Sequence, residues 1–169
     1  MVYVQFSLVR FSSPEVAPLL AGLRLEYNSR YGAGAGDSTE DVPAEEFEAP
    51  NGGFLVLLDG EHTVAGGGIH RFDAETAEIK RMWTNPDYRR QGHARSILRA
   101  LEALAGRLGF ARVRLETGYA QPEALALYRS LGYRDIGNYG IFENASGFER
   151  TLSEPEAAVV TDAAASVTA

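Results

Sequence analysis

The sequence predicts an α/β (α+β) domain, because segments typical of strands and of helices follow one another along most of the chain. Three successive segments have strand composition and are separated by turn signals; they are 54–58, 63–72 and 75–84. The segment after Gly92 instead places its apolar residues at helical spacing. Together these patterns favour helices packed on a sheet.

The N-terminal third of the chain has one strand, one helix and one loop. Residues 2–11 alternate apolar and polar side chains, which is typical of a half-buried strand. A Ser-Pro-Glu sequence at 13–15 has the form of a helix start, and we expect this helix to end near Arg30. Residues 31–51 are rich in Gly, Pro and acidic residues and predict a mobile acidic loop. Such a loop is either a lid over a site or a plainly solvated segment.

The middle of the chain contains hairpins and then a long helix. Asp59-Gly60 is a hairpin signal, Pro86 ends the third strand, and Gly109 ends the helix that follows. Apolar residues of this helix form one stripe from Ala94 to Leu108. The charged residues expected to face away from the stripe are Arg95, Arg99, Glu102 and Arg107.

The C-terminal third of the chain completes the alternation. A strand around Val113, a short helix from Pro122, and strands at 134–142 and 147–152 are expected. Residues 153–169 show no core pattern and predict a disordered tail, so that the domain spans residues 1–152.

Composition excludes several classes of function. The chain of 169 residues has no Cys, which excludes disulfides, thiolate metal sites and a cysteine nucleophile. Its net charge of −7 argues against nucleic-acid binding. No apolar run of about 18 residues is present, and the N-terminus lacks the pattern of a signal peptide, so we expect no membrane contact and a cytoplasmic location. Three scattered His residues do not predict a metal site.

The segment 79–97 carries the clearest chemistry. A strand leads into a loop rich in Arg and Gly, and the loop opens directly into a helix. The first turn of a helix has unpaired N–H groups and a partial positive charge, and Gly92 allows the backbone to approach an anion. Arg89, Arg90 and Arg95 add charge at the same point. This pattern predicts a phosphate site, the alternative being a turn with a solvated arginine face.

Two motifs then indicate a family. Residues 89–94, RRQGHA, fit the pattern [RQ]-x-x-G-x-[GA] of the GCN5-related N-acetyltransferase (GNAT) superfamily. Residues 124–133, ALALYRSLGY, are similar to the ALxLYxxxGF segment of the same family, at a matching distance. The element order also matches over roughly residues 1–152. The chain therefore resembles the GNAT superfamily.

The resemblance implies a fold and a co-substrate. The fold is a mixed, mostly antiparallel sheet with splayed central parallel strands, flanked by helices. The co-substrate is acetyl-CoA, with its pyrophosphate on residues 89–95 and its pantetheine arm between the strands that end near Thr84 and Thr117; no metal is implied. The implied cofactor-binding residues are Met82, Trp83, Thr84, Arg89, Arg90, Gln91, Gly92, His93, Ala94 and Arg95.

The resemblance also implies catalytic residues. Tyr128 has the position of the family's general acid, which protonates the departing thiolate, and its alternative role is that of a core aromatic residue. Counted back from Gly92, Glu78 matches the catalytic base of the histone-type members, and Glu78, Lys80 and Met82 are expected on one strand face. The alternative for Glu78 is an exposed strand glutamate paired with an arginine. Reserve bases are Glu116 and Glu26, and members without a dedicated base exist.

The acceptor pocket is expected among the first helix, the acidic loop and the last hairpin. The candidate substrate-binding residues are Glu26, Tyr27, Arg30, Tyr31 and His70. Tyr27 fits the core equally well, and Glu26 and Arg30 are spaced to pair with each other.

The implied function is acetyl transfer from acetyl-CoA to a primary amine of a small molecule. It is direct, because there is no Cys for a covalent intermediate. The alternatives are a protein Lys or N-terminal acetyltransferase and a non-catalytic acyl-CoA-binding module. The expected partners are acetyl-CoA and the amine, and a homodimer is compatible with the sequence.

Overall fold

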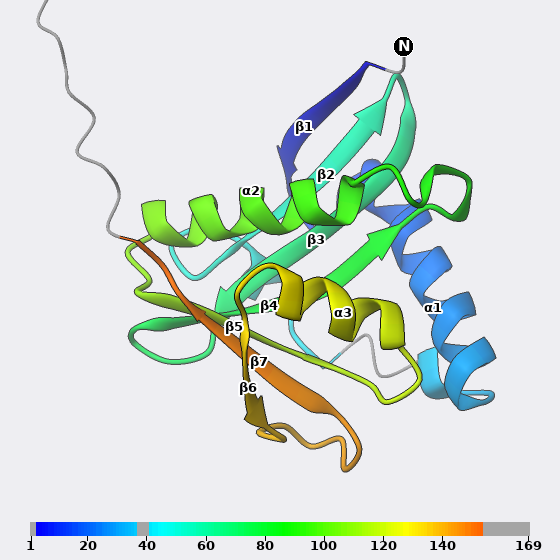
Figure 1. The fold of residues 1–169 in the computed structure, drawn as a ribbon. Coiled ribbons are helices and arrows are strands. Elements are labelled where there is room, and N and C mark those ends of the chain that lie inside the picture. Colours follow the sequence, from blue (N-terminus) through cyan, green and yellow to red (C-terminus); the bar gives the residue numbers. More distant parts are fainter. Residues whose placement is uncertain (1–2, 37–40, 154–169) are drawn as a thin grey trace, which may run out of the picture.

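A seven-stranded sheet runs through the molecule in the order β1-β2-β3-β4-β5-β7-β6 (Figure 1). The structure is a computed structural model and describes residues 3–36 and 41–153. The strands are β1 (Val4–Val9), β2 (Gly53–Asp59), β3 (His62–Arg71), β4 (Thr76–Thr84), β5 (Arg112–Thr117), β6 (Arg134–Gly137) and β7 (Ser146–Thr151). The helices are α1 (Ala17–Tyr31), α2 (His93–Arg107) and α3 (Pro122–Ser130), with 3-10 turns at Pro14–Val16, Ala44–Phe47 and Pro86–Tyr88. Neighbouring strands are antiparallel except for the parallel pair β4–β5, which confirms the predicted fold class.

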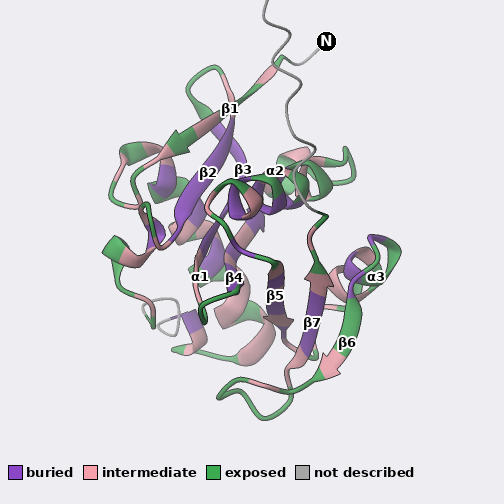
Figure 2. Ribbon diagram, turned by 90° about the vertical axis from the view of Figure 1, so that its left-hand side faces the viewer, coloured by how far each residue is buried: buried purple, intermediate pink, exposed green. Residues whose placement is uncertain are grey.

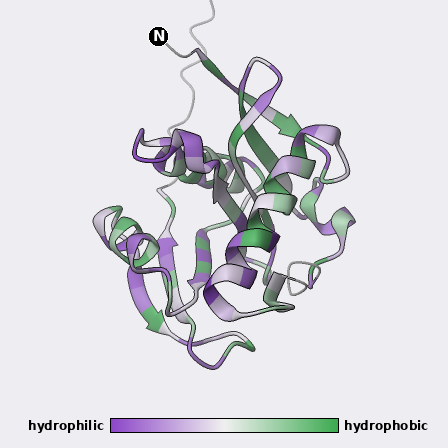
Figure 3. Cartoon of the chain, turned by 90° about the vertical axis from the view of Figure 1, so that its right-hand side faces the viewer, coloured by the Kyte–Doolittle hydropathy of each residue, from purple (hydrophilic) through white to green (hydrophobic). Residues whose placement is uncertain are grey.

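The helices cover the two faces of the sheet and bury a core on each. On one face, α2 and α3 pack against the central strands through residues such as Leu101 and Tyr128. On the other face, α1 packs through Leu19 and Leu23. Buried residues lie along β2 to β5 and β7, whereas β6 is mostly exposed (Figure 2). Seen from its own side, α1 carries both hydrophobic and hydrophilic residues, as a helix at the edge of a core does (Figure 3).

The acidic loop is partly packed rather than simply solvated. Phe47 in the 3-10 turn Ala44–Phe47 is buried and stacks on Phe11, with ring centroids 5.1 Å apart. It also meets the edge of Phe54 at 5.6 Å. This apolar contact ties the second half of the loop to the α1 side of the sheet. Residues 37–40 of the loop and residues 154–169, which are most of the predicted tail, lie outside the described residues.

Glu102 does not face away from the core, as the helical pattern predicted. It is buried, and its carboxylate accepts hydrogen bonds from the Tyr133 hydroxyl at 2.7 Å and from Arg150 at 2.7 Å. Arg99 also donates to it, at 2.8 Å. A carboxylate can be buried on this face because three donors surround it, Arg99 on the same helix and Tyr133 and Arg150 from distant parts of the sequence. The predicted strand 134–142 also differs, because β6 already ends at Gly137.

A β-bulge in β4 changes which side chains share a face. The register between β3 and β4 shifts at this point, and Arg81 has a φ of 62°. The extra residue turns the strand over, so Met82 packs against the α2 side and Trp83 packs against the α1 side. Glu78, Lys80 and Met82 therefore do not lie on one face. The prediction that they do was wrong, because a regular alternation does not include the inserted residue.

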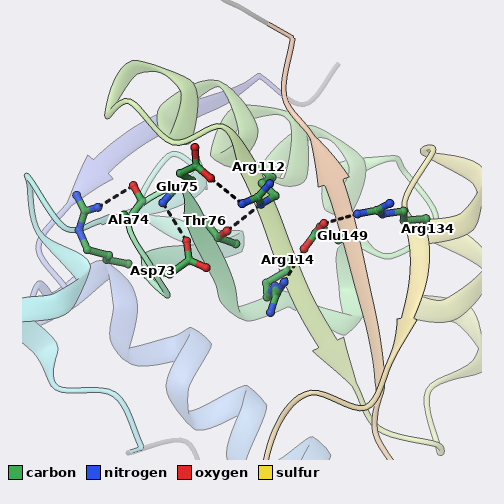
Figure 4. A network of polar contacts seen from close by, with 9 residues as sticks. Asp73, Ala74, Glu75, Thr76, Arg112, Arg114, Arg134 and Glu149 are labelled. Atoms are coloured by element: carbon green, nitrogen blue, oxygen red, sulfur yellow. Dashed lines mark hydrogen bonds and ion pairs between the residues drawn. The ribbon is translucent and has the colours of Figure 1, made fainter.

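The parallel strands β4 and β5 are paired at one end only. Their register is Thr76↔Arg112, Ala77↔Val113 and Glu78↔Arg114, and no pairing between them follows. Side chains reinforce the paired end, where Arg112 donates to Glu75 and Thr76 at 2.9 and 3.1 Å (Figure 4).

The same figure shows that Glu149 on β7 joins Arg114 on β5 and Arg134 on β6, at 2.6 and 2.7 Å. Beyond this fastened end, the β5-facing backbone groups of β4 have no ladder partner in the described residues. The sheet is thus splayed, as predicted, where β4 leads toward α2.

Candidate active site

The loop between β4 and α2 forms an anion cradle. The first hydrogen bond of α2 runs from the Ser96 N–H to the Gly92 carbonyl at 3.1 Å, so the three residues between them have no N–H partner within the helix. Gly92 has a φ of 83°, and a Cβ placed on it would meet nothing within 4 Å. The backbone of Arg90 also lies in the left-handed region, with a φ of 61°. Open space, unpaired donors and the positive end of the helix therefore coincide.

Basic and imidazole groups surround this cradle. Arg89, Arg90 and Arg95 are exposed. Arg89 donates to the Thr84 carbonyl at 3.3 Å and lies 3.4 Å from a carboxylate oxygen of Glu26. Both contacts are long, so Arg89 is weakly held and can turn to an anion. The Nε2 atom of His93, in the first turn of α2, is buried without a partner in the described part of the chain.

A cavity of about 410 Å³ lies between the splayed strands and reaches α1, α3 and the loop before β7. Its lining residues are Tyr27, Tyr31, Ala35, Asp41, Ile79, Lys80, Arg81, Met82, Leu115, Glu116, Thr117, Gly118, Tyr119, Gln121, Tyr128, Phe142, Glu143, Asn144 and Ala145. Five residues singled out from the sequence are among them: Tyr27, Tyr31, Met82, Tyr128 and the reserve base Glu116. The lining includes residues of α1, of the loop after it and of the loop before β7, which are the elements from which an acceptor pocket was predicted.

Burial raises the pKa of two tyrosines that line this cavity. The pKa of Tyr27 rises to about 12. Burial, with a smaller contribution from Tyr27, raises the pKa of Tyr128 far above its ordinary value. Tyr128 therefore keeps its proton at any pH near neutrality and is available as a proton donor.

Other predicted site residues lie outside the lining. Glu26 and Arg30 form an i, i+4 ion pair of 3.1 Å, the alternative noted from their spacing. Arg30 also pairs with Glu123 at 2.5 Å and donates to the Ala120 carbonyl, so it ties α1 to the start of α3. Trp83 packs under α1, against Gly22. These contacts give the residues structural roles in the described chain.

Glu78 is buried, and both of its carboxylate oxygens have hydrogen-bond partners. One carboxylate oxygen is 2.8 Å from His70 Nε2, the other accepts from the Tyr139 hydroxyl at 2.7 Å, and Lys80 Nζ is 3.7 Å away. Burial works to raise the pKa of Glu78, but the hydrogen bonds from His70 and Tyr139, with the charge of Lys80, outweigh it and hold that pKa below the usual value. Neither Glu78 nor His70 lines the cavity.

Glu116 has the opposite environment. It lines the cavity, and its Oε2 atom is buried without a hydrogen-bond partner among the residues described. The carboxylate packs directly on Gly140, where a Cβ would come within 2.3 Å of it. Burial, and more weakly the charges of Glu78 and Asp41, raises the pKa of Glu116 against the opposing effect of Lys80. This carboxyl is therefore better suited to accept a proton near neutral pH than Glu78 is.

A charged cluster in the lining was missed from the sequence. Asp41 accepts from Lys80 at 2.6 Å and from Arg81 at 2.8 Å, and these bonds hold its pKa below the usual value although burial works to raise it. Arg81 faces Asp41 because of the bulge, which no local signal predicted. Thr117, at the end of β5, also has a buried hydroxyl without a partner in the described chain.

No group of three or more His, Asp or Glu residues within 3–36 and 41–153 could hold a metal ion. In the same ranges, no helix has the length and apolar character needed to cross a membrane.

Glu78 and Glu116 are expected to change stability in opposite directions. Glu78 has a lowered folded pKa, so its ionised form stabilises the fold above the usual value of 4.5, and this contribution is lost as the pH falls through the folded pKa. Glu78→Gln should thus lower the free energy of unfolding at neutral pH, with a deficit that shrinks in acid. Glu116 has a raised folded pKa, so stability is lost as the pH rises through it. Glu116→Gln should then raise the free energy of unfolding at neutral pH, with a gain that vanishes in acid.

Urea denaturation of both variants and the wild type, from about pH 3 to pH 8, measures these differences. If both substitutions raised the free energy of unfolding at neutral pH, or both lowered it, the assignment of the two environments would be contradicted.

Comparisons with known proteins agree with this geometry. An IAA acetyltransferase of Azospirillum brasilense is 38% identical over 80 residues, which are 46% of this chain and 52% of that protein. This chain therefore spans about half the length of that relative. An acetyltransferase of Streptococcus agalactiae has the same fold, with a TM-score of 0.73 and 18% identity over 88% of this chain and 98% of that one.

The PaiA N-acetyltransferase of Thermoplasma acidophilum, solved in complex with coenzyme A, also has this fold. Its TM-score is 0.68 and its identity 15%, over 87% of this chain and 99% of that one. The model of the acetyltransferase (GNAT) family matches residues 20–133, which is more than half of the chain and runs from within α1 to just beyond the end of α3. The chain belongs to the GNAT acetyltransferase family.

Proposed function

We propose that this chain transfers the acetyl group of acetyl-CoA directly to a primary amine of a small molecule. The observation that carries the proposal is the cavity between the splayed ends of β4 and β5, which contains Tyr128 and Glu116. It begins close to the anion cradle, because Met82 lines it and the loop to α2 starts at Asn85. A site for a phosphate-bearing co-substrate and a site with an acid and a base thus lie side by side.

The residues present fit acetyl-CoA, which supplies an activated acetyl thioester when bound. The unpaired N–H groups at the start of α2, with Arg89, Arg90 and Arg95, would hold its pyrophosphate. The unpaired edge of β4 between residues 79 and 84 would pair with the amide groups of the pantetheine arm. The fold similarity to PaiA, which was solved with coenzyme A, supports this placement.

Tyr128 and Glu116 provide the two proton transfers that the reaction needs. As the amide bond forms and the carbon–sulfur bond breaks, Glu116 accepts the proton that the amine nitrogen loses, directly or through water. Tyr128 donates its proton to the departing thiolate. We prefer Glu116 to Glu78 as the base because Glu116 lines the cavity and has a raised pKa, whereas Glu78 is saturated with hydrogen bonds.

A small-molecule acceptor is favoured by the shape of the site. The cavity is bounded by α1, α3 and the loop before β7, and side chains from all three line it. A protein Lys or N-terminal acceptor would need a more open groove. Cytoplasmic location and a homodimer stay predictions from the sequence.

The proposal is tested by CoA release and by binding. The wild type should release CoA thiol from acetyl-CoA when primary amines are added, and more slowly with a Lys peptide or a peptide α-amine. Gly92→Glu should abolish acetyl-CoA binding in calorimetry, because it places bulk and negative charge in the cradle. The space around Gly92 is open, but its φ of 83° strains any side chain, so the fold of the variant is checked by circular dichroism. Unchanged affinity in the folded variant would end the acetyl-CoA assignment, and release only with peptides would favour a protein acceptor.

Tyr128→Phe is expected to lower kcat by about 10- to 1000-fold, because the thiolate then leaves without its proton donor. The ring and its packing against Phe148 and Tyr133 are kept, so acetyl-CoA affinity should change little. Steady-state kinetics under conditions where chemistry limits the rate measure this effect. Full kcat in the variant would make Tyr128 a packing residue.

Glu116→Gln is expected to lower turnover at neutral pH by about 100-fold, because a base is lost, with partial recovery as the pH rises and free amine appears. Glu78→Gln is the matched control on the neighbouring strand, and it should lower turnover less and show no such recovery. The pH–rate profiles of both variants measure the difference. The reverse result would return the role of base to Glu78, as the family resemblance implied.

A further inference from the structure

Large apolar side chains are exposed at the outer edge of the cavity. Tyr119 and Phe142 both line it, yet they are 64% and 40% exposed. Ile141, next to Phe142, is 83% exposed. We call these three residues the apolar rim. Apolar side chains that gather at the edge of a cavity, and not in the core, are typical of a surface that a ligand covers.

The apolar rim is held in place by its neighbours. The Tyr119 ring meets Tyr31 edge to face at 5.5 Å, and the Tyr31 hydroxyl accepts from Gln121 at 3.1 Å. On the other side of the entrance, Asn138 fastens the loop that carries Ile141 and Phe142. Its side chain accepts from the Gly140 N–H at 3.0 Å and donates to the Phe142 carbonyl at 2.5 Å.

Glu78 contributes to this arrangement through Tyr139, which begins the same loop. The Tyr139 hydroxyl donates to the buried Glu78 carboxylate at 2.7 Å, and its ring stacks edge to face on Phe72 at 5.6 Å. The loop is therefore pinned at its start and closed on itself at its tip. The exposed side chains of this loop are therefore already ordered before a ligand binds. This lowers the entropy cost of binding.

The carboxylate of Glu116 lies beside the apolar rim, because it packs on Gly140, the residue before Ile141. Among the described lining residues, Glu116 has a buried carboxylate oxygen, Oε2, that has no hydrogen-bond partner. The two lining cations, Lys80 and Arg81, are both paired with Asp41. An amine that reaches Glu116 thus meets an acceptor of its proton, while the rest of the molecule extends toward the apolar rim.

We propose that the acceptor is an arylalkylamine, a primary amine on a short chain that ends in an aromatic ring. The ring would lie on Tyr119, Ile141 and Phe142, and the amine would lie at Glu116. This inference rests on the proposed function, because it names the acceptor class of the same reaction: an N–C amide bond forms, and the thioester C–S bond breaks.

The experiment compares 2-phenylethylamine with propylamine, which has a similar amine and no ring. In the wild type, kcat/KM should be about 10- to 100-fold higher for 2-phenylethylamine, which is the gain expected from burying one phenyl group. Tyr119→Ala and Phe142→Ala should each remove much of this preference, because each should lower kcat/KM for 2-phenylethylamine by more than it lowers kcat/KM for propylamine. Leu8→Ala is the matched control, because Leu8 is an exposed apolar residue on β1, at the opposite edge of the sheet.

The outcomes separate this inference from the proposed function. Equal kcat/KM for the two amines in the wild type would overturn the inference and leave amine acetylation in place. Equal losses for both amines in the rim variants would also overturn it, since the rim would then act on the reaction and not on the ring. Acetyl-CoA binding without acetylation of any amine would instead refute the proposed function.

Discussion

The site depends on the incomplete pairing of β4 and β5. Three residue pairs join these parallel strands, and the contacts of Arg112, Arg114 and Glu149 fasten the same end. At the other end, the bulge at Arg81 bends β4 away from a regular ladder. Because the strands are paired at one end and separate at the other, the open end has both unpaired backbone groups and a cavity between the strands.

The polar groups around the gap are of two kinds: those paired with other side chains, which have structural roles, and those with an unpaired atom, which could take part in a reaction. Lys80 and Arg81 both donate hydrogen bonds to Asp41, and Glu78 is hydrogen-bonded to His70 and Tyr139. A buried charge with such partners has a stable protonation state, which suits a structural role. Glu116 lacks a partner at one oxygen and has a raised pKa, which suits a proton acceptor.

The sequence predicted the order and type of the main elements, because strands, helices and turns have local signals. The hairpin at Asp59-Gly60 and the helix after Gly92 are examples, and Gly92 does have the left-handed backbone expected of the cradle. The family motifs also led to Tyr128, which lines the cavity. Packing that joins distant segments had no such signal. The burial of Glu102 needs Tyr133 and Arg150, and the burial of Phe47 needs Phe11 and Phe54.

The bulge shows why the faces of β4 could not be predicted from the sequence. A regular strand would place Glu78, Lys80 and Met82 on one face, toward one ligand. One inserted residue after Lys80 sends Met82 to the α2 side, whereas Glu78 precedes it and lies beside His70, outside the cavity lining. Glu116 lines the cavity from the adjacent strand, where the pairing of β5 with β7 is regular from Arg112 to Thr117. The strand pattern therefore missed the position of Met82, and it carried no signal for the contacts of Glu78 with His70 and Tyr139, which come from distant parts of the chain.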